Sequence, residues 1–415
     1  MLHAELTTLP NGLRVVTVPD ENAESASFSL VVASGSRHER PRLSGISHFI
    51  EHMLFKGTAK RTARDINRAI EGVGGELNAY TSEQTTSYYA RVPHERLATA
   101  VDVICDMYRN ASVPDSEFER ERQVVLQEIK MYEDDPSSVA SDILRAGLFP
   151  KSPLGVPVSG DEKTLAAMTP QLLRDYVRRA YVPSATVAVV AGRMDPAKAV
   201  ALVSERLGDL KKGRPLAFAG FDDAVPVVRE SVVSREVMQT QLMMGWRLPF
   251  GVRGDARFTL NMLNVVMGYG MSSRLFESVR EKRGLSYDIQ TLPQLFDETG
   301  CWCVAGGVEP SRADEMRSVI EREIERLRTK RVGAAELRRA KDFHKGNVRL
   351  AMERASTRIT FFGGGVMTHG RIVSLDETMA KLEAVTPEMI LEFARTYLVP
   401  ERLAVAKVVP KEASR

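Results

Sequence analysis

One stretch decides how the rest of the chain is interpreted: SGISHFIEHMLFKGT, residues 44–58. Glycines lie near its two ends, and the residues between them favour a helix with Ser44 or Ser47 as the N-cap. Most of these residues are apolar, so the helix is expected to pack into a core. A core helix would not bury two histidines and a glutamate without partners, because each unsatisfied polar group costs about 1–3 kcal/mol.

The three polar residues of this stretch have the spacing of a metal site. In a helix, His48 and His52 are four residues apart, so both imidazoles project from one face, with Glu51 beside them. Two neutral imidazoles on one face can bind Zn²⁺, and an adjacent carboxylate that does not bind the metal can take a proton from metal-activated water. The order H-x-x-E-H is also a metalloprotease signature. The alternative is a solvated histidine pair with no metal.

A catalytic zinc ion usually has three protein ligands, so a third ligand is expected elsewhere in the chain. The segment 114–132 reads as a helix that begins at Pro114 and Asp115. On it, Glu121 and Glu128 are seven residues apart and share a face with apolar residues. The alternative for these glutamates is an ordinary charged surface helix.

The chain resembles the pitrilysin-type zinc peptidases, the inverzincins of family M16, and most of all the bacterial relatives of the mitochondrial processing peptidase. These proteins carry H-x-x-E-H and then E-x6-E, whose second glutamate is the third zinc ligand. Glu128 lies 128 − 52 = 76 positions after His52, close to the usual spacing. The resemblance covers nearly the whole chain. It implies that His48, His52 and Glu128 bind one Zn²⁺ per chain, that Glu51 is the general base, and that Glu121 supports the site.

Composition agrees with an ordinary globular protein. The 415 residues are too many for one core of typical size, so two or more domains are expected. A net charge of +3 and the lack of a clustered basic tract argue against a nucleic-acid-binding protein. The sparse cysteines, Cys105, Cys301 and Cys303, indicate a reducing compartment and packed free thiols.

The sequence gives no sign of a membrane or an export route. The first residues form neither a secretory signal nor an Arg-rich presequence. No stretch approaches 18 consecutive apolar residues, so no transmembrane helix is expected. We therefore expect a bacterial cytoplasmic protein.

The rest of the first half supplies a sheet and a substrate-binding edge. The expected elements are strands at 13–18 and 28–33, a helix at 62–73, and a hairpin at 76–92 with its turn at 82–84. By the resemblance, the first strand of this hairpin is an edge strand that binds the substrate as an added β-strand. Asn78 and Ala79 are then the residues beside the scissile bond.

The second half repeats the order of elements of the first half, which indicates a duplication. Its expected elements are a strand at 241–247, a helix at 255–267, a strand at 301–307 and a helix at 335–352. The helix at 255–267 lacks H-x-x-E-H, so this half should be free of metal. The predicted fold class is α+β, with two homologous domains, each a mostly antiparallel sheet flanked by helices. The predicted boundaries are 1–210 for the metal-bearing domain, 211–224 for a linker and 225–415 for the second domain.

A helix–strand junction at 272–287 completes the predicted site. The helix ends at Gly284, and a strand follows it. The resemblance places an arginine and a tyrosine seven residues apart at this junction, and both contact the substrate backbone. Arg280 and Tyr287 match this pair, and both side chains can donate hydrogen bonds to a carbonyl or oxyanion oxygen.

The predicted function is a zinc-dependent endopeptidase that cleaves peptides or unfolded segments. The resemblance implies that each chain forms half of a clamshell-like chamber, and that two chains form a homodimer with shared active sites. Two alternatives stay open at this point. In the first alternative, the chain is a non-catalytic scaffold subunit. In the second, it is one partner of a heterodimeric processing peptidase.

Overall fold

The computed structural model describes residues 3–411, and its contacts divide the chain into two compact units. The first unit consists of Met1–Ile129, Pro157–Ala219 and Arg349–Leu375, and the second of Lys130–Val156, Gly220–Val348 and Asp376–Arg415. Compared with the sequential division at 211–224, two segments change sides, because each carries a helix that packs on the sheet of the other half. These helices are α5 (Pro136–Leu148), which packs on the second sheet, and α12 (Ala355–His369), which packs on the first.

The first unit is built on a six-stranded sheet with the order β1-β2-β6-β3-β5-β4. Only β2 and β6 pair in parallel, and the other neighbours are antiparallel. The strands are β1 (Glu5–Thr8), β2 (Arg14–Pro19), β3 (Ser25–Val32), β4 (Glu76–Thr81), β5 (Thr86–Pro93) and β6 (Thr186–Gly192). The hairpin predicted at 76–92 is therefore confirmed, and its first strand, β4, forms one edge of the sheet.

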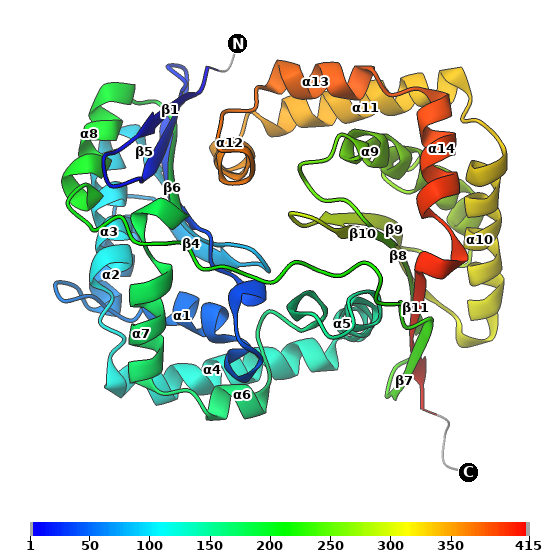
Figure 1. The fold of residues 1–415 in the computed structure, drawn as a ribbon, viewed down its shortest axis with the longest axis horizontal. Coiled ribbons are helices and arrows are strands. Elements are labelled where there is room, and N and C mark those ends of the chain that lie inside the picture. The colour runs from blue at the N-terminus through cyan, green and yellow to red at the C-terminus, as the bar shows by residue number, and fades with distance from the viewer. Residues whose placement is uncertain (1–2, 412–415) are drawn as a thin grey trace. The chain divides into compact units, whose positions relative to one another are not determined.

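Helices cover both faces of this sheet, which explains why its central strands are apolar throughout (Figure 1). Val187 and Val189 of β6 pack in a cluster with α12, whereas Ala188 and Val190 point into the main core with α1 and α3. This alternation is the period of two that a strand requires. The remaining helices are α1 (Ile46–Leu54), α2 (Ala63–Glu71), α3 (Leu97–Asn110), α4 (Asp115–Asp134), α6 (Glu162–Ala166), α7 (Pro170–Ala180) and α8 (Pro196–Leu207).

The second unit contains a five-stranded sheet with the order β7-β11-β8-β10-β9. Here β7 and β11 pair in parallel and the others are antiparallel, so the pattern repeats β2-β6-β3-β5-β4 strand for strand. The predicted duplication is confirmed, and β1 has no counterpart. The strands are β7 (Glu230–Arg235), β8 (Thr240–Leu248), β9 (Ile289–Leu295), β10 (Gly300–Val308) and β11 (Leu403–Pro410).

Strand β9 occupies the edge position that β4 has in the first sheet, and it contains a proline. The turn after β9 is closed by a hydrogen bond from Phe296 N to Thr299 O, 2.8 Å long. Because pairing alternates along an antiparallel ladder, the odd-numbered residues of β9 direct their backbone groups to the open edge. Pro293 belongs to this outward set.

The helices of the second unit flank its sheet, and its core holds the two cysteines of β10. Cys301 and Cys303 are buried with Sγ atoms 3.7 Å apart, as expected for packed free thiols. The helices are α9 (Ala256–Met267), α10 (Ala313–Thr329), α11 (Ala334–Ala351, which extends into the first unit), α13 (Leu375–Glu383) and α14 (Pro387–Tyr397). Within residues 3–411, no helix has both the length and the apolar character that a membrane span requires.

Candidate metal centre

The structure brings the three predicted metal ligands together in the first unit. His48 and His52 project from α1, and Glu128 projects from α4 beside them. Their ligand atoms all lie within 4.8 Å of one another. Glu128 Oε2 is 3.6 Å from His48 Nε2 and 3.2 Å from His52 Nε2.

The two distances from Glu128 fit a tetrahedral zinc ion. Zinc binds imidazole nitrogen and carboxylate oxygen at about 2.0–2.2 Å, so tetrahedral ligands lie about 3.3–3.6 Å apart. The two distances from Glu128 Oε2 are close to this range. Burial, followed by the charge of His52, lowers the pKa of His48 to about 4, so at neutral pH its imidazole is uncharged and has a lone pair to offer a metal.

Glu121 fixes the orientation of His52. Its Oε1 lies 2.9 Å from His52 Nδ1, so a proton on Nδ1 leaves Nε2 free to face the metal position. Burial lowers the pKa of His52, but its hydrogen bonds with Glu121 and Glu128 outweigh burial and raise that pKa to about 9. A metal ion must therefore displace a proton from His52 in order to bind.

Both carboxylate oxygens of Glu121 bond to neighbouring side chains, so neither oxygen faces the converging ligand atoms unpaired. Glu121 is 4% exposed, and its Oε2 forms an ion pair with Lys56 Nζ at 2.6 Å. Burial raises the pKa of Glu121, but the hydrogen bonds from His52 and Lys56 lower it by more than burial raises it. The net shift of this pKa is downward. Sequence analysis did not select Lys56, although it follows His52 by four residues.

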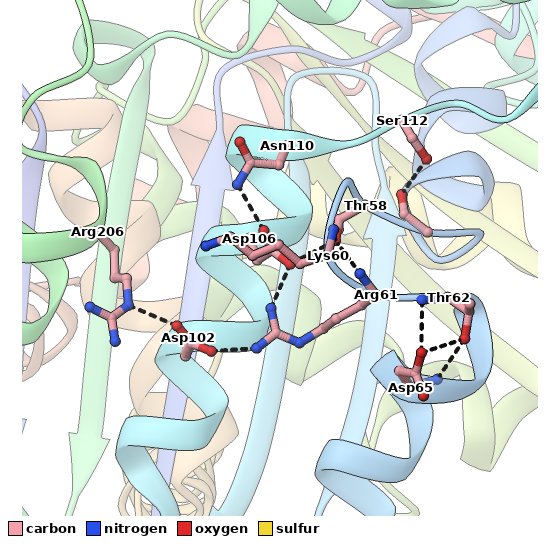
Figure 2. Close-up of polar contacts among 11 residues, drawn as sticks. Thr58, Lys60, Arg61, Thr62, Asp65, Asp102, Asp106, Asn110, Ser112 and Arg206 are labelled. Atoms are coloured by element: carbon pink, nitrogen blue, oxygen red, sulfur yellow. Dashed lines mark hydrogen bonds and ion pairs between the residues drawn. The ribbon is translucent and has the colours of Figure 1, made fainter.

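The loop that follows α1 is bonded to α3, and these bonds hold the end of α1 in place (Figure 2). Thr58 Oγ1 donates to Asp106 at 2.7 Å, and Arg61 bonds to both Asp102 and Asp106. Ser112 Oγ also donates to the loop backbone, at 3.0 Å from Gly57 O. This network explains how a loop directly behind His52 can present Lys56 to Glu121.

Glu51, the predicted general base, lies next to the edge strand β4. Its Oε2 accepts a hydrogen bond from Thr81 Oγ1 at 2.6 Å, and Thr81 is the last residue of β4. Burial raises the pKa of Glu51, and the Thr81 hydrogen bond and the charge of His52 offset only part of that rise. A base with a raised pKa binds a proton more readily, which suits a group that takes a proton and returns it. No sequence pattern predicted that Thr81 bonds to Glu51.

Strand β4 directs every second pair of backbone groups toward its open edge. Ser82 N donates to Thr85 O at 2.8 Å, so the even-numbered residues of β4 pair with β5 and the odd-numbered ones face outward. Ala79 therefore has an outward N–H, and this N–H donates to the side-chain Oδ1 of Asn78 at 2.8 Å. The Asn78 oxygen thus occupies a place that the carbonyl of an added strand could take.

Comparisons with known proteins agree with this geometry. The family model described as Insulinase (Peptidase family M16) matches residues 14–162, and the one described as Peptidase M16 inactive domain matches residues 167–343. An uncharacterized zinc protease of Streptomyces coelicolor is 36% identical over 99% of this chain and 91% of its own length. The chain belongs to peptidase family M16. The resemblance inferred from the sequence is therefore confirmed.

Other M16 relatives and solved structures extend over the whole chain. An uncharacterized zinc protease of Bacillus subtilis is 32% identical over 97% of both proteins. The crystal structure of a protease from Helicobacter pylori has a TM-score of 0.93 at 21% identity, covering 99% of this chain and 100% of that one. An M16-like peptidase from Alicyclobacillus acidocaldarius has a TM-score of 0.89 at 21% identity, covering 99% of each chain. These structures share the fold of this M16 chain.

The predicted substrate-binding pair of the M16 chain, Arg280 and Tyr287, lies in the second unit. Arg280 belongs to a π-helix, Phe276–Glu281, which ends before the predicted end at Gly284, and Gly284 has φ +57°. The Arg280 guanidinium lies 4.3 Å from the centre of the Tyr287 ring, and Tyr287 is 81% exposed. The structure therefore places these two side chains together, with the tyrosine open to solvent.

A buried glutamate, rather than a serine, caps the N-terminus of α1 in this M16 chain. The predicted Ser44 or Ser47 cap is wrong, because the N-cap is Gly45, with φ +90°. Glu39 supplies the missing acceptors: its two carboxylate oxygens each accept a backbone N–H, from Gly45 and Ser47, at 2.8 Å. Glu39 is 7% exposed, and burial raises its pKa to about 7 although both hydrogen bonds lower it.

We expect this cap to make stability depend on pH. The folded state holds a proton on Glu39 more tightly than the unfolded state, so its contribution to the free energy of unfolding is fully present below about pH 4.5 and is lost as the pH rises through about 7. Glu39→Gln does not titrate, so this pH-dependent contribution is absent from the variant. Urea unfolding in chelating buffer should therefore show a larger gap between wild type and Glu39→Gln at pH 5 than at pH 8. The exposed control Glu71→Gln should show no such change, and an equal gap at both pH values would contradict the assignment.

Proposed function

We propose that this M16 chain is a zinc-dependent endopeptidase that cleaves peptides or unfolded segments, with one zinc ion per chain. The observation that carries the proposal is the convergence of His48, His52 and Glu128, whose ligand atoms lie within 4.8 Å of one another, with Glu51 beside them. Relatives named zinc proteases, at 36% identity over nearly the whole chain, support the same reading.

His48, His52 and Glu128 would hold the ion, and Glu51 would move the proton. When bound, the metal lowers the pKa of water and polarises a carbonyl group. Thr81 holds Glu51 Oε2, which leaves Oε1 to take the proton of the attacking water. The same oxygen returns this proton to the nitrogen of the leaving amine.

The substrate would lie extended along the open edge of β4. Backbone groups of Ala79 and Thr81 face this edge, so an added strand can pair with them through its main chain. For pairing to occur, the side chain of Asn78 has to release the N–H of Ala79. Only an extended chain can add to a sheet in this way, which accounts for a preference for peptides and unfolded segments over folded proteins.

Arg280 and Tyr287 would bind the substrate backbone and stabilise the oxyanion. A guanidinium and a phenol are both hydrogen-bond donors, and Tyr287 is exposed enough to meet a substrate. Following the resemblance, we propose a cytoplasmic homodimer in which this pair from one subunit completes the metal site of the other. An intact donor set and an intact Arg–Tyr pair both argue against a purely structural subunit.

We expect cleavage of a quenched mixed-peptide pool to require the metal. Treatment with a chelator should abolish cleavage, and one equivalent of Zn²⁺ per chain should restore it. A buffer-treated sample that passes through the same desalting steps is the control. If the protein binds zinc tightly but cleaves no peptide of the pool, the endopeptidase proposal fails in favour of the non-catalytic or heterodimeric subunit.

A further inference from the structure

The residue that ends β4 touches both halves of the proposed chemistry. The side chain of Thr81 donates to Glu51 Oε2 at 2.6 Å, whereas its backbone belongs to the outward set of the edge strand. In the described part of the chain, Thr81 is thus the β4 residue whose side chain bonds to the proposed base while its main chain lines the proposed substrate edge.

Thr81 is held firmly because the turn after it is fixed on both sides. Within the turn, Ser82 Oγ accepts from Thr85 N at 3.1 Å. On the other side, Ser36 N donates to Ser82 O at 3.2 Å, and Thr86 Oγ1 donates to Ser34 O at 2.8 Å. Gly35 makes this close approach possible, since a Cβ there would lie 2.3 Å from Ser82 O. The closed end of the hairpin is therefore tied by hydrogen bonds to the segment that follows β3.

The hydrogen bond from Thr81 to Glu51 also suits a base whose carboxylate must keep one orientation. A glutamate side chain has three rotatable bonds, and its carboxylate has two equivalent oxygens. A short hydrogen bond to Oε2 favours one orientation of the Glu51 carboxylate, which leaves Oε1 for the attacking water. A β-branched threonine suits this task because its χ1 angle is restricted, so the hydroxyl itself is held in place.

We propose that Thr81 is a positioning residue that keeps the general base in register with the substrate strand. The inference rests on the proposed function, because it assigns Glu51 as the base and β4 as the substrate edge. Thr81 places both reaction partners: its backbone pairs with the substrate, and its hydroxyl bonds to the base. The distance between the attacked carbonyl and Glu51 Oε1 is then fixed by the strand itself.

The test compares Thr81→Val with Thr81→Ser in steady-state kinetics and zinc titration. Valine keeps the β-branched shape and removes the hydroxyl, so kcat should fall about tenfold or more while KM changes less than about twofold. Serine keeps the hydroxyl and should restore most of kcat. Zinc affinity, measured by chelator competition, should match the wild type in both variants, because Thr81 contacts no metal ligand. The matched control is Tyr80→Phe, which removes a hydroxyl from the neighbouring residue on the opposite face of β4.

The outcomes separate this inference from the function on which it rests. A wild-type protein that cleaves nothing contradicts the proposed function. A wild type that cleaves peptides, together with a Thr81→Val variant of equal kcat, overturns the role of Thr81 alone. A fall in kcat that Thr81→Ser does not rescue, or that comes with lost zinc, would mean that residue 81 acts only through the fold.

Discussion

Glu51→Gln should keep its zinc and cleave peptides about 10²–10⁴-fold more slowly than the wild type, the range that a positioned general base contributes. The substitution preserves the shape of the side chain, and the amide oxygen can still accept the hydrogen bond from Thr81. Glu51 is also outside the group of His48, His52 and Glu128, whose ligand atoms converge. What is lost is the ability of the side chain to take a proton.

The measurement is cleavage of the quenched peptide pool, with bound metal counted by elemental analysis in the same samples. Glu71→Gln, on the exposed surface of α2, removes one carboxylate of the same unit and should behave like the wild type. Loss of metal from Glu51→Gln would instead make Glu51 part of the metal-binding set. Unchanged cleavage with metal retained would require another base.

Mixing two inactive variants should restore activity if active sites are shared between subunits. Glu51→Gln impairs the metal half of a site, and Tyr287→Phe impairs the substrate-binding half. In a heterodimer of the two, one site has both defects and the other has neither. Random exchange of equal amounts makes half of the dimers heterodimers, so we expect recovery of about a quarter of the wild-type activity.

The control mixture combines two defects in the same half of the site. Glu51→Gln mixed with Glu128→Ala leaves every site defective on the metal side and should recover nothing. Subunit exchange is verified by mass spectrometry of isotope-labelled chains. Exchange without recovery in the first mixture would refute the shared-site homodimer, although the endopeptidase proposal itself would stand.

The sequence predicted what depends on local spacing and on repetition. The period of α1 places His48 and His52 on one face, and the repeated order of elements predicted the second sheet. The assignment of Glu128 as the third ligand needed the family resemblance, because nothing local links α4 to α1. The structure then placed its carboxylate within 3.6 Å of both imidazoles.

Other parts of the site could not be predicted, because they depend on contacts between distant segments. Glu39 caps α1 from a position outside the helix pattern, and Thr81 reaches Glu51 from a strand 30 residues away. Lys56 lies beyond the end of α1, where helical spacing no longer indicates direction. The apolar faces of α5 and α12 show that each helix packs on something, but they do not specify which sheet it covers.

The proline in β9 gives the two related sheets different vulnerabilities. An uncovered strand edge can recruit any extended chain, including another copy of the same protein during folding, so a duplicated edge adds a second place at which chains can aggregate. Pro293 lacks the N–H that would face outward, and it interrupts the edge without weakening the pairing of β9 with β10. In the first sheet, Asn78 covers one outward N–H with a side chain that can rotate away. The edge of β4 can thus still pair with an added strand when Asn78 moves away, whereas Pro293 in β9 disfavours such pairing at all times.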